Sequence, residues 1–260
     1  MELNLYQIDA FTDQLFGGNP AAVCPLDSWL PEATMQAIAM ENNLSETAFI
    51  VHETSGWRIR WFTPVTEVKL CGHATLASAW VYFNHLQTDA RQVVFDSLSG
   101  PLTVSRDGDR LTLDFPVQRA EPVVAPGVMA AALGCTPLEV LANDDWLVLL
   151  DSEQTVRGLQ PDMGLLRKLE RRGLMVTAAS SDCDFVSRFF APKYGIDEDP
   201  VTGAAHTALT PFWAERLGKS RLHARQLSAR GGELFCELQG ERVLISGCAA
   251  PYLRGVISLP

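Results

Sequence analysis

Three residues of this sequence can transfer protons and stand in short motifs: Glu46 in Ser45-Glu46-Thr47, His73 in Cys71-Gly72-His73, and Asp199 in Asp199-Pro200-Val201-Thr202-Gly203. Glu46 falls where an apolar strand starts, and a half-buried carboxylate there can exchange protons near neutral pH. His73 falls one residue into an apolar helix whose N-terminus disfavours positive charge. We therefore expect a neutral imidazole that donates to a developing oxyanion. Asp199 precedes a second such helix and is either a partner of its dipole or a second acid–base group.

These residue types indicate general acid–base chemistry. The alternatives are a solvated surface role for Glu46 and a purely local hydrogen-bonding role for His73. A third alternative uses Cys71, because a helix N-terminus lowers the pKa of a thiol and two facing thiols can racemise a substrate without a cofactor. The equivalent residue before Gly203 is Thr202, so the second thiol is missing. We expect Cys71 to be a small buried residue.

A metal site has weaker support in the sequence. Glu46, His73, Asp199 and His206 could converge, but the chain has no His-x-His or His-x-x-x-His spacing. The double-glycine segments at residues 17–18 and 231–232 lack the lysine and hydroxyl residue of a P-loop and the spacing of a dinucleotide-binding loop. The sequence therefore predicts no metal and no cofactor.

The elements that position these residues repeat along the chain. The segment Arg60-Trp61-Phe62-Thr63-Pro64 predicts a strand end, and Gly72 begins a helix to about Phe83 that has no polar face and so belongs in a core. The first N–H groups of such a helix attract a carboxylate or phosphate. Arg188-Phe189-Phe190-Ala191-Pro192 and the helix from Gly203 repeat this pattern about 130 residues later, although Pro211 should kink or shorten the second helix.

The repeat predicts two similar domains. We place the first at residues 1–116, completed by a C-terminal strand at 250–260, and the second at 117–249. When the halves are superimposed at a shift of about 130 residues, Glu46 faces Val176. The carboxylate is therefore a feature of the first half alone.

Composition narrows the class of protein. The chain has 260 residues, 47% of them hydrophobic, and a formal net charge of −10 without a Lys/Arg run, so neither nucleic acid nor a membrane is an expected partner. No apolar run reaches membrane-spanning length. Six cysteines without a Cys-x-x-Cys pair indicate reduced thiols, and we expect a cytoplasmic protein.

Four motifs together resemble the phenazine-biosynthesis isomerase family (PhzF-like), in the order of that family and over nearly the whole chain. They are Gly18-Asn19-Pro20-Ala21-Ala22-Val23, Asn43-Leu44-Ser45-Glu46-Thr47-Ala48-Phe49, Leu70-Cys71-Gly72-His73-Ala74-Thr75-Leu76-Ala77 and Asp199-Pro200-Val201-Thr202-Gly203. The resemblance implies a diaminopimelate-epimerase-like α+β fold of two similar domains. Each domain is a curved mixed β-sheet wrapped around a buried central helix, and the active site of the family lies in the cleft between them.

The resemblance also implies roles for individual residues. The family reaction is a cofactor-free isomerisation of trans-2,3-dihydro-3-hydroxyanthranilate, in which Glu46 here would move the proton while His73 and Asp199 assist. Asn19 and the backbone amides at Gly72, Gly203 and Ala204 would bind the substrate and its carboxylate. The family often has serine at the position of Ala204, so a hydroxyl contact is lost and the identity of the substrate stays open.

The sequence thus predicts a cofactor-independent isomerase or epimerase that acts on a small carboxylate, with a homodimer implied by the resemblance. A small-molecule binding protein on the same scaffold is the alternative from another class, and retention of Glu46, His73 and Asp199 argues against it. A lyase that uses the same base is a third possibility, which product analysis separates.

Overall fold

The computed structural model describes residues 1–259. For Tyr194 it describes only the backbone. Contacts within the chain form two compact units, the first from Met1–Phe115 together with the residues from Leu244 onward, and the second from Pro116–Val243. The predicted domains differ from this division at residue 116 and at residues 244–249. The reason is local, because β17 (Arg242–Gly247) pairs with β8 (Arg110–Pro116), and the hydroxyl of Ser246 lies 2.8 Å from that of Thr112.

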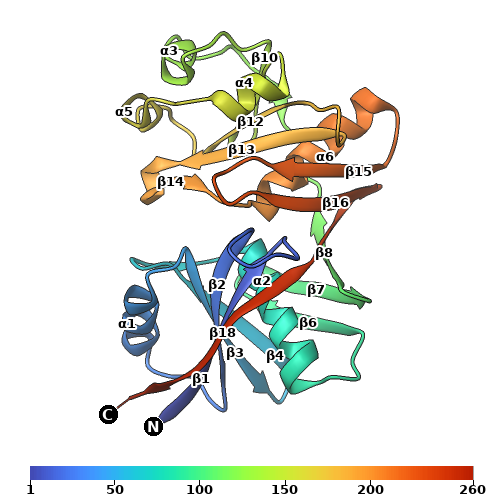
Figure 1. The fold of residues 1–260 in the computed structure, drawn as a ribbon. Helices are drawn as coiled ribbons and strands as arrows, with labels where there is room; N and C mark the ends of the chain where they lie inside the picture. Colours follow the sequence, from blue (N-terminus) through green and yellow to red (C-terminus); the bar gives the residue numbers. More distant parts are fainter. Residues whose placement is uncertain (260) are drawn as a thin grey trace. The chain divides into compact units, whose positions relative to one another are not determined.

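The first unit is built on a mixed sheet. Besides β8 and β17, its strands are β1 (Glu2–Ala10), β2 (Asn19–Leu26), β3 (Glu46–Glu53), β4 (Gly56–Phe62), β5 (Glu67–Val68), β6 (Gln92–Ser97), β7 (Gly100–Asp107) and β18 (Ala249–Ser258). The helix α2 (Gly72–Val81) packs against β1, β2 and β3 (Figure 1). It is buried on every side except at Trp80, as its apolar sequence predicts, and continues as a π-helical turn over Tyr82–Leu86.

A second helix of this unit, α1 (Glu32–Asn42), covers the opposite face of β3. Its residues Met35, Ile38 and Ala39 pack in one cluster with Phe49 and Val51. Since side chains alternate along a strand, the odd-numbered residues of β3 face α1, and the even-numbered face that contains Glu46 is directed to α2.

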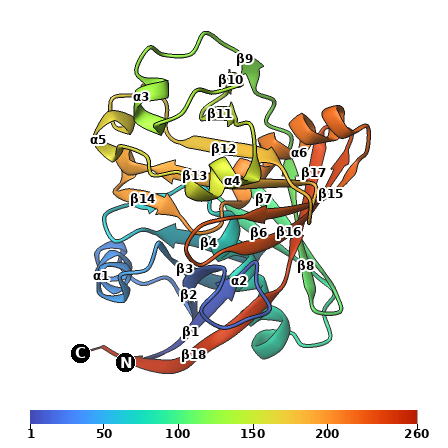
Figure 2. The same cartoon turned by 45° about the horizontal axis from the view of Figure 1, so that its top comes forward.

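The second unit has the same order of strands. They are β9 (Glu121–Pro122), β10 (Glu139–Ala142), β11 (Trp146–Leu149), β12 (Leu174–Ala179), β13 (Phe185–Ala191), β14 (Ile196–Asp199), β15 (Arg221–Gln226) and β16 (Gly232–Gln239). The helix α6 (Gly203–Leu217) packs against β15 and β16, and it continues through Pro211 rather than ending there. The short helices α3 (Met129–Leu133), α4 (Glu153–Gly158) and α5 (Met163–Leu166) lie beside the strands that precede β15 (Figure 2).

Strand pairing repeats between the units. In the first, β2 is parallel to β3, β3 is antiparallel to β4, β4 is antiparallel to β5 and parallel to β6, and β6 is antiparallel to β7. In the second, β11, β12, β13, β14, β15 and β16 follow these same directions in the same succession. In each unit, a strand ends one or two residues before a proline, and a short strand then leads to a helix that begins with glycine.

The arginine of the repeated motif binds a glutamate on the next strand in both units. Arg60 on β4 binds Glu67 on β5 through two hydrogen bonds of 2.7 Å, and Arg188 on β13 binds Glu198 on β14 at 2.7 and 2.9 Å. Such bidentate pairs fix orientation as well as distance. Arg188 is 9% exposed, and its remaining nitrogen donates to the carbonyls of Val156 and Leu159.

The same registers correct one sequence alignment. Arg60 lies opposite Phe49, and Arg188 lies opposite Val176, so the residue equivalent to Glu46 is Gly173 rather than Val176. A Cβ atom at Gly173 would lie 2.5 Å from the ring of Phe189. The second unit therefore has no room for a side chain where the first carries its carboxylate.

Among residues 1–259, no helix combines the length and apolar character needed to cross a membrane.

Candidate active site

Two of the predicted acid–base residues, Glu46 and His73, are in contact. Glu46 is the first residue of β3, and His73 is the second residue of α2. Oε2 of Glu46 lies 3.2 Å from Nε2 of His73, with side-chain exposures of 12% and 6%. The strand start and the helix start thus bring together two residues that are 27 positions apart in the sequence (73 − 46).

The other nitrogen of the His73 ring is also occupied. The amide Nδ2 of Asn19, a fully buried residue at the start of β2, lies 3.1 Å from Nδ1 of His73, and Sγ of Cys71 lies 3.5 Å from the same nitrogen. Sequence reasoning assigned Asn19 to the substrate. In the structure its amide contacts His73, so it also orients the ring between Asn19 and Glu46.

The charge of His73 differs from the sequence-based expectation. Burial lowers the pKa of His73, but negative charge on Cys71 and Glu46 raises it, and the result lies well above 6.5. Burial in turn raises the pKa of the Cys71 thiol to about 11, with a further increase from Glu46. The thiol is therefore neutral at pH 7 and adds no negative charge beside His73, which leaves Glu46, 3.2 Å away, as the acidic neighbour of the ring. The direction of the His73 shift is opposite to the one expected from the helix N-terminus alone.

Cys71 itself behaves as a buried residue. It is 7% exposed, and desolvation by burial outweighs the lowering of its pKa by the backbone N–H of Ala74 at the start of the helix. As the N-cap residue of α2, it contributes its backbone carbonyl, which accepts a 2.5 Å hydrogen bond from the hydroxyl of Thr75.

One group of residues could hold a metal ion. One ligand atom from each of Glu46, Cys71 and His73 lies within 4.8 Å of the other two. Burial raises the pKa of the Cys71 thiol to about 11, so a metal ion bound there would have to displace the thiol proton.

In the second unit, the structure places Asp199 at the end of β14, directly before α6. Its Oδ2 accepts a 2.5 Å hydrogen bond from the hydroxyl of Thr202, the N-cap residue of α6. Gly203 and Ala204 then form the first turn of that helix. In the described part of the chain, neither Cys71 nor Thr202 uses its side chain to cap its helix, so no N-cap side chain occupies the N–H groups of α2 or α6.

Sequence reasoning missed Gln226, the last residue of β15. It is 1% exposed and bonds to both Asp199 and Thr202. No motif identifies it, because it lies 24 residues beyond Thr202 (226 − 202). The one available signal is a glutamine at the end of a strand whose alternate residues are apolar.

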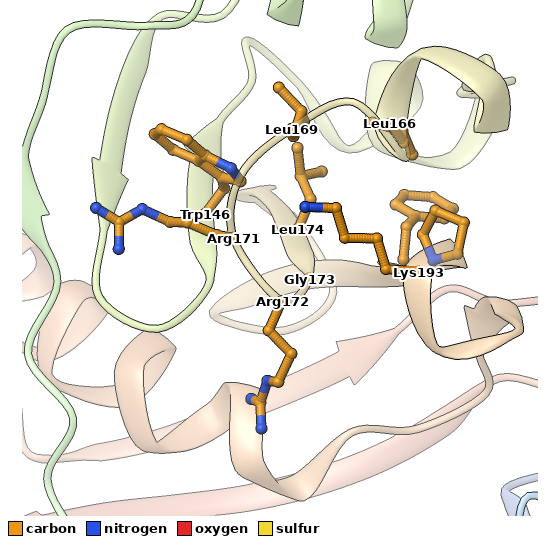
Figure 3. Close-up of a pocket in the computed structure, with 10 residues that line it drawn as sticks. Trp146, Leu166, Leu169, Arg171, Arg172, Gly173, Leu174 and Lys193 are labelled. Atoms are coloured by element: carbon orange, nitrogen blue, oxygen red, sulfur yellow. The ribbon is translucent and has the colours of Figure 1, made fainter. Parts of the chain in front are cut away.

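A separate small pocket lies in the second unit between Trp146, Gly173 and Leu174, near the basic side chains of Arg171, Arg172 and Lys193 (Figure 3). Its volume of about 10 Å³ holds about one water molecule. Arg172 pairs with Asp145. The pocket is too small for a substrate, and none of the predicted site residues lines it.

Comparisons with known proteins agree with the motifs. The family described as "Phenazine biosynthesis-like protein" matches residues 8–255. An uncharacterized isomerase of Pseudomonas aeruginosa is 54% identical over 259 residues, which cover 100% of each chain. The crystal structure of a PhzF-family phenazine biosynthesis protein from Enterococcus faecalis has a TM-score of 0.97 and 46% identity, with 100% of each chain covered.

A more distant structure shows how far the fold extends. A hydroxyproline epimerase from Agrobacterium vitis has a TM-score of 0.64 at 12% identity, covering 99% of this chain and 93% of the epimerase. At this identity the likeness is one of fold alone. The mixed α/β architecture with its extensive mixed sheet is thus common to PhzF proteins and to epimerases.

Proposed function

This chain belongs to the phenazine biosynthesis-like (PhzF) family, and we propose that it is a cofactor-independent isomerase that moves a proton on a small carboxylate substrate. The observation that carries the proposal is the buried contact between Glu46 and His73 at the start of α2. The reaction is similar to the isomerisation of trans-2,3-dihydro-3-hydroxyanthranilate. The substrate of this chain is identified only by class.

In the proposed reaction, the Glu46 carboxylate removes a proton from an acidic carbon of the substrate. The electron pair of the broken C–H bond moves into the adjacent unsaturated system, and Glu46 returns the proton to another carbon, so that no atom is gained or lost. His73, whose Nε2 lies 3.2 Å from Oε2 of Glu46, can donate a hydrogen bond as charge develops in the reaction. The neighbouring N–H groups of α2, from Gly72 onward, supply a favourable environment for the substrate carboxylate.

Asp199, Gly203 and Ala204 have proposed roles in the second unit. Asp199 would assist proton transfer, and the amides of the first turn of α6 would bind the carboxylate of the substrate. The uncapped N-terminus of α6 supports this proposal. A cytoplasmic homodimer is part of the same proposal, and light scattering of the purified protein tests its oligomeric state.

Proton exchange read by NMR tests the function. The wild type and Glu46→Gln are incubated in D₂O with a panel of small amino, hydroxy and cyclohexadiene carboxylates. We expect deuterium at a carbon of at least one compound with the wild type and none with the variant. Tight binding of a panel compound that Glu46→Gln leaves unchanged, without exchange by either protein, would support a binding protein instead. A product that has lost water would indicate a lyase.

A further inference from the structure

A buried side chain outside the recognised motifs fixes the segment that carries Asp199. The amide oxygen of Gln226 accepts a hydrogen bond from the backbone N–H of Thr202 at 2.8 Å. Its amide nitrogen donates to the backbone carbonyl of Asp199 at 2.7 Å and to the hydroxyl oxygen of Thr202 at 3.2 Å. An amide side chain has two N–H groups and one oxygen, so every polar atom of Gln226 is used on this one segment.

These contacts determine which way the hydroxyl of Thr202 points. Because its oxygen accepts an N–H from Gln226, its own proton is directed to Oδ2 of Asp199, 2.5 Å away. The chain of donors from Gln226 through Thr202 therefore holds Asp199 in one orientation, with a carboxylate oxygen as acceptor.

The rest of Thr202 is held in the same way. Nδ1 of His206 donates to its backbone carbonyl at 2.9 Å. Burial lowers the pKa of His206 to about 4, so its ring is neutral at pH 7 with the proton on Nδ1. A threonine at an N-cap usually turns its hydroxyl oxygen to the N–H groups of the first turn, and Thr202 does not. The hydroxyl is used on Asp199 instead.

We infer that Gln226 is a positioning residue for Asp199, acting through the Thr202 hydroxyl. This inference rests on the proposed function, since it gives Asp199 a purpose only if Asp199 assists proton transfer. Loss of the Gln226 amide would release the Asp199 carboxylate from its productive orientation without removing any group that touches the substrate.

The first test needs no substrate. Amide hydrogen exchange of Thr202 is followed by NMR in the wild type, in Gln226→Leu, and in Gln239→Leu, a control at an exposed glutamine of β16. We expect exchange at Thr202 to accelerate about 10-fold in Gln226→Leu, as one lost hydrogen bond predicts, and to stay unchanged in the control. Unchanged exchange in Gln226→Leu would overturn the inference.

The second test separates positioning from general destabilisation. Deuterium exchange is measured on the panel carboxylate that the wild type labels fastest, with Gln226→Glu, Thr202→Val and Thr202→Ser. We expect Gln226→Glu and Thr202→Val to lose on the order of 10²-fold in kcat with little change in KM. Thr202→Ser should retain most of the wild-type rate, because serine keeps the hydroxyl group. If Asp199→Asn abolishes exchange while Gln226→Glu keeps full kcat, the inference fails alone. If Asp199→Asn itself keeps full kcat, the proposed role of Asp199 fails and the inference fails with it.

Discussion

Nε2 of His73 lies 3.2 Å from Oε2 of Glu46, in a place where both side chains are almost fully buried. The contact joins the first residue of β3 to the second residue of α2, and the described residues at the equivalent positions of the second unit form no such pair. There, Gly173 takes the place of Glu46, and Ala204 follows the helix-opening glycine where the first unit has His73. The two units thus have similar strand pairing, and the first carries the predicted acid–base pair.

The charge of His73 predicts how stability depends on pH. Its pKa in the folded protein lies well above the 6.5 of an unperturbed histidine. Below about pH 6.5 both states bind the proton, and the stabilisation by Glu46 is fully present; it is lost as pH rises through the pKa of the folded state. We expect the free energy of unfolding of the wild type to exceed that of His73→Gln most at pH 6, and the difference to shrink in alkaline buffer. Urea unfolding at a series of pH values measures this, and a difference that grows with pH would contradict the assignment.

His206 predicts the opposite dependence. Burial lowers the pKa of His206 from 6.5 to about 4, so between these pH values the unfolded chain binds a proton at His206 and the folded protein does not. Stability from this group is present above pH 6.5 and falls by about 3 kcal/mol as pH drops to 4, at ~1.4 kcal/mol per pH unit. His206→Gln should therefore lose less stability than the wild type over this range. His52→Gln, at an exposed position, is the matched control and should behave like the wild type.

The thiol of Cys71 should be inert. With a pKa of about 11 and 7% exposure, it is neither ionised nor accessible at pH 8. We expect iodoacetamide to leave Cys71 unmodified in the folded protein while it modifies the more exposed Cys135, as peptide mass spectrometry would show. Cys71→Ser should keep most of the proton exchange. Loss of exchange in that variant would revive a thiol mechanism.

The core around α2 should resist enlargement. Ala77 is fully buried inside a helix that contacts β1, β2, β3 and β18. Ala77→Leu adds three carbons to a close-packed site and should destabilise the protein by about 1–3 kcal/mol. Ala37→Leu, on the exposed side of α1, makes the same chemical change in water and should have little effect. Thermal unfolding of the two variants gives the comparison.

Much of this arrangement follows from local sequence patterns. A helix without a polar face is expected to be buried, and α2 is buried. The repeated Arg-aromatic-Phe-x-Pro segment predicts the same local structure in both units, and in each unit its arginine binds a glutamate on the next strand. The alignment of Glu46 with Val176 failed, because the loops before the strands differ in length and only pairing across the sheet fixes register.

What the sequence could not predict depends on contacts between distant segments. The pKa of His73 depends on its contacts with Cys71 and Glu46, and the burial of Cys71 raises a thiol pKa that its helix position alone would lower. Gln226 is brought to Asp199 by the pairing of β15 with β13 and β16. Neither distance nor burial is encoded in a motif, so chemistry that depends on them becomes visible only in the folded chain.

The central claim is that Glu46 moves the proton, and deuterium exchange tests it most directly. The wild type, Glu46→Gln and Glu41→Gln, a control at an exposed glutamate of α1, are compared in D₂O on the panel carboxylate that the wild type labels fastest. We expect Glu46→Gln to lose about 10²–10⁴-fold in exchange rate, the typical contribution of a general base, and Glu41→Gln to keep the full rate. Equal exchange by Glu46→Gln and the wild type would contradict the account and remove Glu46 from the mechanism.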